Sequence, residues 1–495
     1  MRISFSVSLL LAIAGRAAAY SQRQQQVITT DLDADDFHIH PGHTYTLSHL
    51  HVPNHKLEIK SHDGDWCDPD VKSYSGYINA GHGRDLFFTF FESRDKPAED
   101  PVVLWINGGP GCSSMLGMYQ ELGPCTIVDP SHINGTKVNP HSWNSKANVI
   151  FLEEPLGVSF SYGRHGQTTG TTEQAAVDVQ AFLSLFFKTF DRFRGNAFYM
   201  AGESYGGRYL PVFASAVYDL NDRNALHGLP VINLQGVLIG NGITSAFKMQ
   251  EAYYTYQCTS IEGIGRPLLP IAACVEMRKS LPYCVEMTHA ECLKRHDRIA
   301  CQGAMDFCAS KVGEPFWNLG LNPYDVSKRC TRDELADGLC YGEAMRNIST
   351  YLDLPEVRSY LGVSERIGNW TACSNKVAQA FADSMDETDM TWLYVAGLLE
   401  RKIPVISYVG TYDWICNYIG NEAWLEDLEW TGSMGYKTAE VRDWEVEGKV
   451  AGYTKTFGGL TFATVAGAGH MVPMDKPVEA LALLNRWIEG GGDAL

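Results

Sequence analysis

Two kinds of hydrophobic pattern alternate along this chain. Short, almost wholly apolar runs recur, which is typical of strands buried on both faces of a sheet. Residues 171–190, 207–220 and 477–488 instead carry apolar residues at helical spacing. This alternation predicts a mostly parallel sheet with helices on both faces. The predicted strands are Ser73–Asn79 and Leu86–Glu92, which alternate like a hairpin, and Val102–Ile106, Asn148–Leu152, Ala197–Ala201, Leu234–Ile239, Ile403–Val409 and Thr461–Val465.

The α/β pattern stops between residues 245 and 390, where eight of the thirteen cysteines lie close together, from Cys258 to Cys340. The chain contains no Cys-x-x-Cys pair, so this cluster favours disulfides over a zinc site. We interpret 245–390 as a cap of irregular loops, joined by disulfides and inserted into one α/β core. The core would consist of residues 65–244 and 391–495. An odd number of cysteines leaves at least one thiol unpaired.

The N-terminal residues carry targeting signals rather than the α/β pattern. Residues 1–19 combine a positive charge, an apolar run and three closing alanines, as a secretory signal peptide does. Residues 20–64 hold seven of the fifteen histidines, and we interpret them as a leader or propeptide outside the catalytic core, with a metal-binding tract as the alternative. N-linked glycans are expected at Asn134, Asn347 and Asn369, which begin Asn-x-Ser/Thr sequons. These features predict a secreted protein, with the vacuole as a second destination.

Composition and charge narrow the range of partners. Hydrophobic residues make up 45% of the chain, which is globular composition and excludes wholesale disorder. The net charge is −18, the opposite sign to that of a nucleic-acid-binding protein. After the signal no segment is apolar and long enough to span a membrane. We therefore expect neither nucleic acid nor a membrane as a partner, and nothing in the sequence indicates the oligomeric state.

A candidate nucleophile lies in Gly202–Gly206, a Gly-x-Ser-x-Gly motif between a predicted strand and a predicted helix. In a nucleophile elbow, small residues let strand and helix approach, and the serine hydroxyl projects above the sheet. Ser204 is that serine. In α/β-hydrolases the acid and then the histidine follow the serine along the chain. Asp413 and His470 each lie just past a predicted strand, so we expect Asp413 to orient His470, the general base.

An acyl-transfer site also needs two donors for the oxyanion. The amide of Tyr205, which follows the nucleophile, is one candidate. The glycine-rich turn Asn107–Gly111 follows an early strand, and the amide of Gly109 is the second candidate. Losing one such donor costs about 3–4 kcal/mol in the transition state.

Four motifs in this order resemble the serine carboxypeptidase family, and within it the secreted fungal carboxypeptidase S1-like enzymes. The motifs are Trp105–Ser114, Gly202–Gly207, Asp413 with Ile415–Asn417, and Gly467–Pro473, and the hairpin with Ser73–Tyr77 and Leu86–Phe88 also matches. The resemblance covers about residues 65–490. It implies an α/β-hydrolase fold with a disulfide-rich cap insertion, and a reaction that uses no metal and no organic cofactor.

The resemblance also implies how a substrate is held. In the family, an asparagine and two glutamates bind the C-terminal carboxylate of a peptide, and the matching residues here are Asn107, Glu121 and Glu203. Ionised glutamates would repel that carboxylate, whereas protonated ones donate hydrogen bonds to it. We therefore expect peptide and protein C-termini as substrates and an acidic pH optimum for their hydrolysis.

Several cysteines acquire roles from the same resemblance. Cys416 matches a free cysteine of the family near the catalytic site, so it is the candidate for the unpaired thiol. Cys112–Cys373 matches a family disulfide. A disulfide between Cys67 and Cys125 is possible, but their spacing alone does not establish it.

The sequence departs from the family at two places. Thr411 stands where the family often has Asp, and Glu153-Glu154 stands where it often has Asp-Gln. Neither change touches the predicted triad. The insertion is the least family-like part, so both apolar and basic residues stay open at P1, the residue before the scissile bond.

The sequence thus predicts a secreted serine-type carboxypeptidase that acts through an acyl-enzyme. An acyltransferase or esterase of the same architecture is the alternative, because it could keep the triad. A non-catalytic glycoprotein is disfavoured, because Ser204, Asp413 and His470 are all present.

Overall fold

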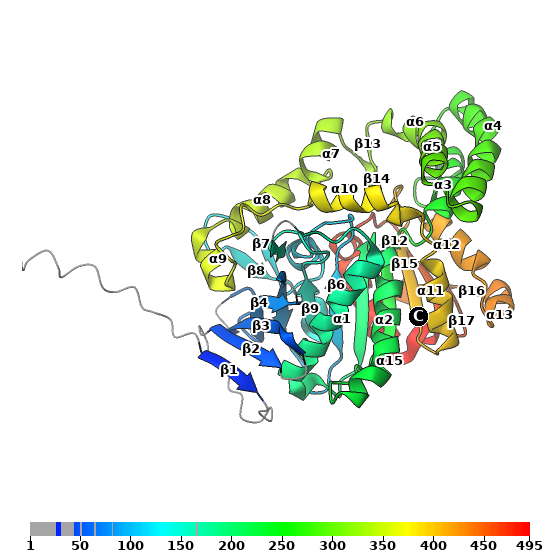
Figure 1. The fold of residues 1–495 in the computed structure, drawn as a ribbon. Coiled ribbons are helices and arrows are strands. Elements are labelled where there is room, and N and C mark those ends of the chain that lie inside the picture. The colour runs from blue at the N-terminus through cyan, green and yellow to red at the C-terminus, as the bar shows by residue number, and fades with distance from the viewer. Residues whose placement is uncertain (1–25, 31–43, 50–51, 64–65, 82, 165–166) are drawn as a thin grey trace, which may run out of the picture.

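The computed structural model describes residues 26–30, 44–49, 52–63, 66–81, 83–164 and 167–495. The predicted signal peptide and much of the predicted leader lie outside these residues. One large twisted sheet crosses the molecule, with helices packed against it and a second group of helices beyond one end of its strands (Figure 1).

The centre of the sheet is parallel, as predicted. Its six strands are, in spatial order, β9 (Asn148–Leu152), β6 (Val102–Ile106), β11 (Phe198–Ser204), β12 (Leu234–Gly242), β15 (Val405–Gly410) and β18 (Leu460–Val465). All five pairings between them are parallel. Their carboxyl ends therefore meet at one edge, where β11, β15 and β18 deliver the loops that carry the predicted triad.

Antiparallel strands extend both sides of this centre. On one side lie β5 (Arg84–Phe91), β4 (Lys72–Asn79), β3 (Val52–Asp63) and β2 (Thr44–His49), with β1 (Gln26–Thr30) parallel to β2 and the short β10 (Tyr162–Gly163) pairing with β5. On the other side, β17 (Lys449–Phe457) and β16 (Val441–Val446) follow β18. The sequence pattern did not predict β3, β16 or β17.

Strand β3 corrects the predicted boundary of the leader. It pairs with β4 from Lys56 to Asp63. Ile59 is fully buried in the core, and the ring of His62 is buried with its Nε2 2.8 Å from the Ser75 hydroxyl. The predicted leader therefore does not lie outside the core over this strand. Charged and histidine residues between the apolar ones had obscured its period of two.

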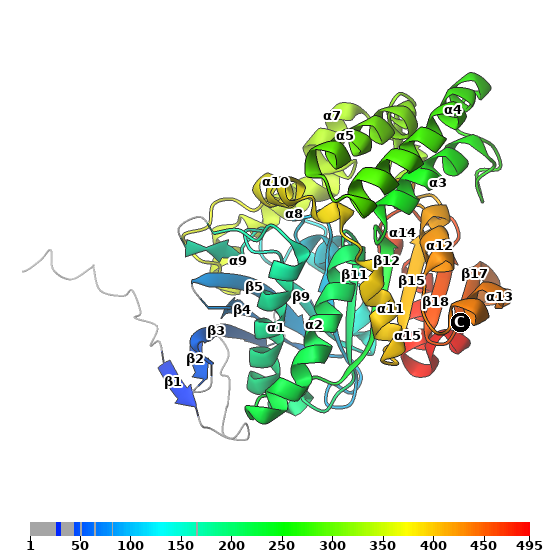
Figure 2. The same ribbon diagram turned by 45° about the vertical axis from the view of Figure 1, so that its right-hand side comes forward.

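Helices cover both faces of the sheet. Helices α1 (Thr172–Thr189), α2 (Gly206–Leu226) and α11 (Trp392–Glu400) lie on one face, and α15 (Pro477–Gly490) lies on the other (Figures 1 and 2). Strand β6 shows the division: Leu104 packs with the first group of helices, while Val103 and Trp105 pack on the side of α15. Alternate residues of one strand thus belong to two cores, which explains the continuous apolar runs.

The insertion is helical, so the prediction of irregular loops was wrong. It contains α3 (Ala246–Cys258), α4 (Ile271–Thr288), α5 (Arg298–Cys308), α6 (Glu314–Trp317), α7 (Arg332–Gly338), α8 (Gly342–Leu352), α9 (Pro355–Leu361) and α10 (Asn375–Ser384), with a small hairpin of β13 (Leu321–Asn322) and β14 (Asp325–Arg329). Burial differs among these helices: α4 buries only Met277, Cys284 and Thr288, whereas α3 buries six of its thirteen residues. In α4 the apolar stripe was too thin to recognise.

Four disulfides lie within the insertion, one joins the insertion to the core and one lies within the core. Within the insertion the pairs are Cys258–Cys274, Cys284–Cys308, Cys292–Cys301 and Cys330–Cys340. The family-implied Cys112–Cys373 bond is present, and so is Cys67–Cys125, the pairing that spacing had left open.

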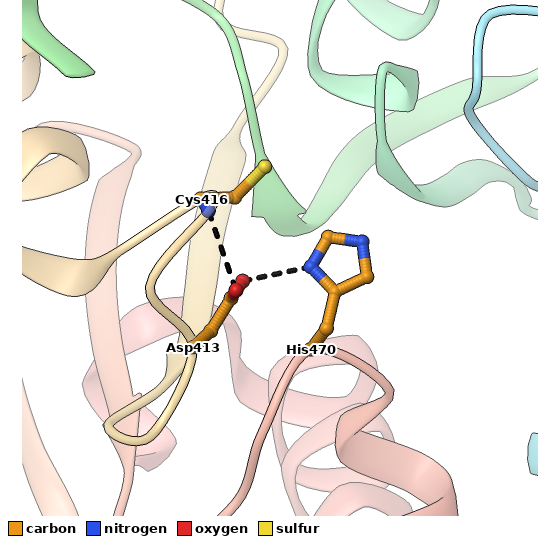
Figure 3. Close-up of side chains that lie close together, drawn as sticks. All are labelled: Asp413, Cys416 and His470. Carbon is orange, nitrogen blue, oxygen red and sulfur yellow. Dashed lines mark hydrogen bonds and ion pairs between the residues drawn. The ribbon is translucent and has the colours of Figure 1, made fainter. Parts of the chain in front are cut away.

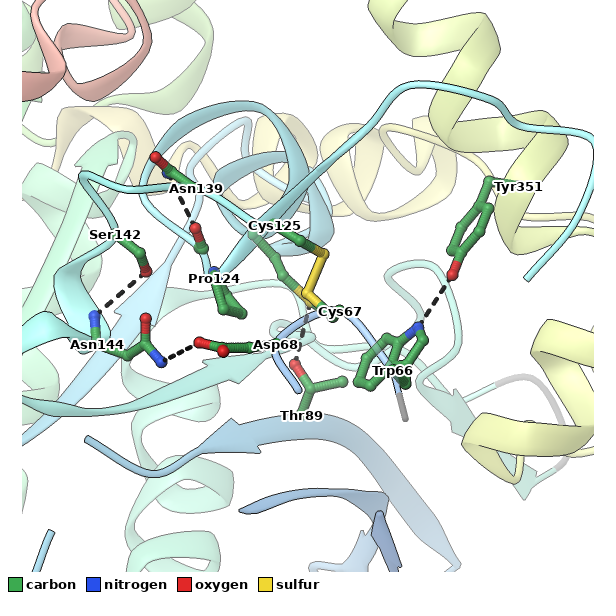
Figure 4. The surroundings of a disulfide bond; sticks show 12 residues. Trp66, Cys67, Asp68, Thr89, Pro124, Cys125, Asn139, Ser142, Asn144 and Tyr351 are labelled. Atoms are coloured by element: carbon green, nitrogen blue, oxygen red, sulfur yellow. Dashed lines mark hydrogen bonds between the residues drawn. A yellow bond between two sulfur atoms is a disulfide. The ribbon is translucent and has the colours of Figure 1, made fainter. Parts of the chain in front are cut away.

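The surroundings of Cys67–Cys125 connect three parts of the chain (Figure 4). Trp66 donates a hydrogen bond of 3.0 Å to the hydroxyl of Tyr351 in α8. On the other side, the buried carboxylate of Asp68 accepts from Arg94 at 2.7 Å and from Asn144 at 3.1 Å. The disulfide therefore joins two parts of the core, and the adjacent Trp66 connects them to the insertion through Tyr351.

The remaining elements are short. A hairpin of β7 (Cys125–Ile127) and β8 (Thr136–Val138) precedes β9, and α12 (Tyr418–Asp427), α13 (Ser433–Thr438) and α14 (Val472–Asp475) lie in the C-terminal part. Across the described ranges, every helix is too short or too polar to cross a membrane.

Candidate active site

Ser204 ends strand β11 at the tight turn that leads into α2. Its φ is +59°, a left-handed conformation that is rare for a residue with a side chain and is typical of a strained functional turn. The turn lies close to β6, because a Cβ added to Gly202 would stand 2.3 Å from the carbonyl oxygen of Ile106. The geometry is that of the predicted nucleophile elbow.

Asp413 and His470 lie together at the same edge of the sheet. Nδ1 of His470 is 2.7 Å from Oδ2 of Asp413 (Figure 3). Asp413 is fully buried and His470 is 4% exposed, so water screens this contact little. The ring of His470 also packs against Tyr324, with centroids 5.1 Å apart. The arrangement fixes the direction of the imidazole.

The carboxylate of Asp413 is itself held by several donors. Oδ2 also accepts a hydrogen bond of 2.7 Å from the side chain of Asn241, at the end of β12. Oδ1 accepts from the amides of Ile415 at 3.1 Å and Cys416 at 3.3 Å. The sequence pattern did not reveal Asn241, although its place beside a glycine at the end of a predicted strand was the available signal.

Cys416 is the free, buried cysteine of the described chain, as the resemblance implied. Its side chain lies beside Asp413 and His470 in Figure 3 and hydrogen-bonds Ser204. Burial raises the pKa of its thiol well above the usual range, and the nearby Asp413 carboxylate adds to this effect. Cys416 therefore stays a neutral thiol, and it connects Ser204 in space to the Asp413–His470 pair.

The predicted oxyanion turn packs directly on the nucleophile turn. A Cβ added to Gly108 would stand 2.3 Å from the Tyr205 nitrogen and 2.8 Å from the Cβ of Ser204. Within the described part of the chain, the amides of Gly109 and Tyr205 donate no hydrogen bond. Tyr205 therefore belongs to the nucleophile turn, and Gly109 belongs to the turn that packs on it.

A buried group of one amide and two carboxyls adjoins this turn. Nδ2 of Asn107 donates to Glu203 at 2.9 Å and to Glu121 at 3.3 Å. The Oδ1 of Asn107 accepts from the indole of Trp105 at 2.7 Å and from the amide of Gly117 at 3.0 Å, which fixes the orientation of the amide. The structure therefore brings together the three residues implied to bind a carboxylate.

The pKa values of the two glutamates of this group are raised, and each glutamate acts on the other. Burial raises the pKa of Glu121 to about 7, and burial together with Glu121 raises the pKa of Glu203 well above its usual range. Each carboxyl hydrogen-bonds the other, so the protonated form of one donates to its neighbour.

A cavity of about 560 Å³ lies next to the group of Asn107, Glu121 and Glu203, between the core and the insertion. Gln120, next to Glu121, and Met474, near His470, line its core side. Tyr341 and Asn347 line its other side.

A second buried network supports the nucleophile turn from behind. The carboxylate of Asp386 accepts from the Tyr205 hydroxyl at 2.8 Å and from the amide and hydroxyl of Thr172 at 2.6 and 2.7 Å. The fully buried guanidinium of Arg208 donates to the main-chain oxygen of Asp386 and, at 2.8 Å, to that of Asp389. The sequence pattern indicated none of these partners.

Two sets of side chains could offer three ligand atoms to a metal. They are Asp413, Cys416 and His470, and Glu173, Asp386 and Asp389. In the first set the Asp413–His470 contact already engages two of the three donors. In the second, hydrogen bonds from Thr172 and Tyr205 engage Asp386. Both sets therefore have a structural explanation without an ion.

The three sequons differ in exposure. Asn134 and Asn369 are exposed, whereas Asn347 is half-buried on α8. All three side chains can be reached from solvent, as a glycosylation site requires.

Comparisons with known proteins agree with this geometry. The sequence model described as serine carboxypeptidase matches residues 64–490. A carboxypeptidase Y of Candida albicans is 39% identical, over 92% of this chain and 79% of its own length. A vacuolar serine-type carboxypeptidase of Saccharomyces cerevisiae is 37% identical, over 95% and 89%, and a carboxypeptidase Y homolog of Aspergillus oryzae is 41% identical, over 86% and 75%.

A solved structure is similar as well. Kex1, a prohormone-processing carboxypeptidase of Saccharomyces cerevisiae, superposes with a TM-score of 0.72 at 23% identity, over 86% of this chain and 93% of that one. The likeness shows a shared fold and confirms the predicted α/β-hydrolase class. With the family match, it identifies the chain as a member of the serine carboxypeptidase family of hydrolases.

Proposed function

We propose that this protein removes C-terminal amino acids from peptides and proteins through an acyl-enzyme on Ser204. The buried group of Asn107, Glu121 and Glu203 beside the nucleophile turn is the observation that carries the proposal. When protonated, the two carboxyls can donate hydrogen bonds to a free carboxylate, and Glu203 directly precedes Ser204 in the chain. An endopeptidase cleaves within a chain and does not need a group that binds a C-terminal carboxylate.

The proposal assigns a residue to each step of the reaction. His470 takes the proton of Ser204 as the hydroxyl attacks the last peptide carbonyl, and Asp413 stabilises the imidazolium. The amides of Gly109 and Tyr205 hold the oxyanion. The leaving amino acid takes the proton from His470, and water then hydrolyses the acyl-enzyme. These steps need no metal and no organic cofactor.

Acidic conditions favour this binding. While Glu121 and Glu203 are protonated, they can donate hydrogen bonds to the substrate carboxylate. Once the pair ionises, its negative charge repels that carboxylate. Because burial raises the pKa of Glu121 to about 7, hydrolysis of peptides should decline as pH rises through neutrality. We therefore place the optimum on the acidic side.

Secretion, or delivery to the vacuole, completes the proposal. The pattern of a signal peptide over residues 1–19 and six disulfides support passage through an oxidising compartment. Glycans on Asn134, Asn347 and Asn369 accord with the same route.

Release of free amino acid from an N-blocked dipeptide, and from the matched ester, tests the function. The enzyme and Ser204→Ala would be compared at pH of about 4.5 and 7.5. Acid-favoured peptide cleavage, absent from the variant, is the expected result. Ester cleavage or acyl transfer without peptide cleavage would instead assign the protein to the acyltransferase or esterase alternative.

A further inference from the structure

The turn between β13 and β14 of the insertion is bonded to the His470 loop, which follows β18. This turn consists of Pro323 and Tyr324. The carbonyl oxygen of Tyr324 accepts a hydrogen bond of 2.7 Å from the amide of His470, and the two rings pack with centroids 5.1 Å apart. A Cβ added to Gly469 would stand 2.4 Å from the same oxygen. The insertion therefore contacts His470 through both its main chain and its ring.

The same turn is bonded to the Asp413 loop, which follows β15. The carbonyl oxygen of Pro323 accepts hydrogen bonds of 3.1 Å from the amides of Trp414 and Ile415, the two residues after Asp413. The indole of Trp414 also stacks on the ring of Phe316 in α6, with centroids 4.0 Å apart. Two consecutive carbonyls of the insertion thus hold the Asp413 loop and the His470 loop against each other.

Asp475 in α14 adds a second connection between the hairpin and the His470 loop. Its Oδ2 accepts a hydrogen bond of 2.8 Å from the amide of Gly469. Its Oδ1 lies 3.2 Å from Nζ of Lys328 in β14, and the same Nζ lies 2.7 Å from Oδ2 of Asp325. The side chains of Asp475 and Asp325 are 11% and 4% exposed, so the lysine joins two largely buried carboxylates. These contacts form a continuous path from the hairpin to the residue before His470.

We infer that this hairpin positions Asp413 and His470 relative to each other, and that Asp475 and Lys328 are positioning residues that hold the hairpin to the His470 loop. The inference rests on the proposed function, because the two loops affect the rate only if His470 accepts the proton of Ser204. Reacting groups that are misplaced by about 1 Å can lose about a hundredfold in rate. The insertion thus acts on catalysis through the two loops, and in this role it supplies no reacting group.

A fluorophosphonate, which labels a serine activated by a histidine, tests this role. The reagent has no carboxylate, so the group that binds a substrate carboxylate takes no part in its reaction. The final extent of labelling counts the folded molecules, whereas the rate of labelling reports how well His470 activates Ser204. A loss of folding alone would therefore lower the extent and leave the rate of the remaining molecules unchanged.

Variants at Asp475 and Lys328 separate the contacts. Asp475→Leu removes the acceptor of the Gly469 amide and the partner of Lys328, so the rate of labelling should fall about tenfold or more at full extent. Asp475→Asn keeps an acceptor oxygen for the amide, and its rate should stay within about threefold of the wild type. Lys328→Met should lower the rate less than Asp475→Leu does, because the side chain of Lys328 is 51% exposed. Added to Asp475→Leu, it should lower the rate no further, since both changes break one contact.

Lys248→Met is the matched control. Nζ of Lys248 in α3 also joins the insertion to the core, at 2.7 Å from Oδ2 of Asp427 in α12, but its partners in the described chain are Glu251 and Asp427 and neither catalytic loop. Its rate of labelling should equal that of the wild type.

The outcomes distinguish the inference from the proposed function. An unchanged rate in fully labelled Asp475→Leu would overturn the inference, even in an enzyme that proves to be a carboxypeptidase. A wild type that is labelled but releases no amino acid from peptides would overturn the proposed function alone. A wild type that is not labelled would overturn both.

Discussion

The hydroxyl of Tyr205 donates a hydrogen bond of 2.8 Å to the buried carboxylate of Asp386. The amide of Tyr205 is a proposed oxyanion donor, so this bond ties the donor to α1, α2 and the end of the insertion. Tyr205→Phe keeps the ring and loses the bond. We expect kcat for a dipeptide to fall about tenfold, with KM nearly unchanged, because the donor matters most in the transition state.

Tyr209→Phe is the control for that measurement. The Tyr209 hydroxyl is also buried but makes no contact with Asp386; it hydrogen-bonds the backbone of Gly111. Its removal should leave kcat and KM within about twofold of the wild type. Equal losses in both variants would mean that packing, and not the contact with Asp386, accounts for the effect.

Gly108→Ala should inactivate the enzyme. The added methyl would lie 2.3 Å from the Tyr205 nitrogen and 2.7 Å from the Glu203 carbonyl, so the oxyanion turn must move away from the nucleophile. A displaced donor costs about a hundredfold or more in kcat. Gly303→Ala on α5 meets no atom within 4 Å and should retain activity. Substantial activity in Gly108→Ala would contradict the assignment of this turn.

Glu121→Gln should change the pH profile of peptide hydrolysis. With the pKa of Glu121 raised to about 7, kcat/KM of the wild type for free-acid peptides should decline as pH rises above about 7. Glutamine stays neutral, so the decline should move to higher pH, where Glu203 ionises. A peptide amide lacks the carboxylate and serves as control. Identical profiles for the acid and the amide would rule out the protonated pair as the cause.

Glu154→Gln should stabilise the protein at alkaline pH. Burial, with Asp178 nearby, raises the pKa of Glu154 well above its usual range, and neither carboxylate oxygen has a hydrogen-bond partner among the described residues. The folded state therefore binds this proton more tightly than the unfolded state does. The resulting stabilisation is complete below a pH of about 4.3, the pKa of an unfolded glutamate. It is lost as pH rises through the raised pKa, at a rate of about 1.4 kcal/mol per pH unit between the two pKa values.

Thermal melting between pH of about 5 and 8 measures this effect. The Tm of the wild type should fall toward pH 8, and Glu154→Gln should fall less. Exposed Glu365→Gln should follow the wild type. A parallel fall in Glu154→Gln would attribute the pH dependence to other groups, of which Glu153, with a pKa raised to about 7, is the first to examine.

The sequence predicted the parts of the site that sit at strand ends. Ser204, Asp413 and His470 each follow a buried strand, and their order along the chain carries information. Asp386 and Arg208 were unpredictable, because their partners are set by packing between distant segments. Asp386 is 181 residues from Tyr205 in the sequence. Asn241 was only partly predictable, because it lies at a strand end but belongs to no recognised motif.

The elements of the fold also differ in how well the sequence predicts them. Strands with both faces buried were recognised within a few residues, as Val102–Ile106 was. Edge strands were not: β16 exposes four of its six residues and alternates too weakly to identify. The helices of the insertion depend on disulfides in place of a broad apolar face, and connectivity of cysteines is not encoded in their spacing.

The bond between Cys112 and Cys373 joins residues 261 positions apart, and Cys112 stands three residues after Gly109. At a synthesis rate of about 5–20 residues per second, Cys112 leaves the ribosome roughly 13–52 s before its partner. Cys67 emerges before Cys112 and Cys125 emerges shortly after it, so both are present during this delay as possible incorrect partners. Assembly of the catalytic loop must therefore wait for the end of the insertion, and a truncated nascent chain cannot become a premature protease.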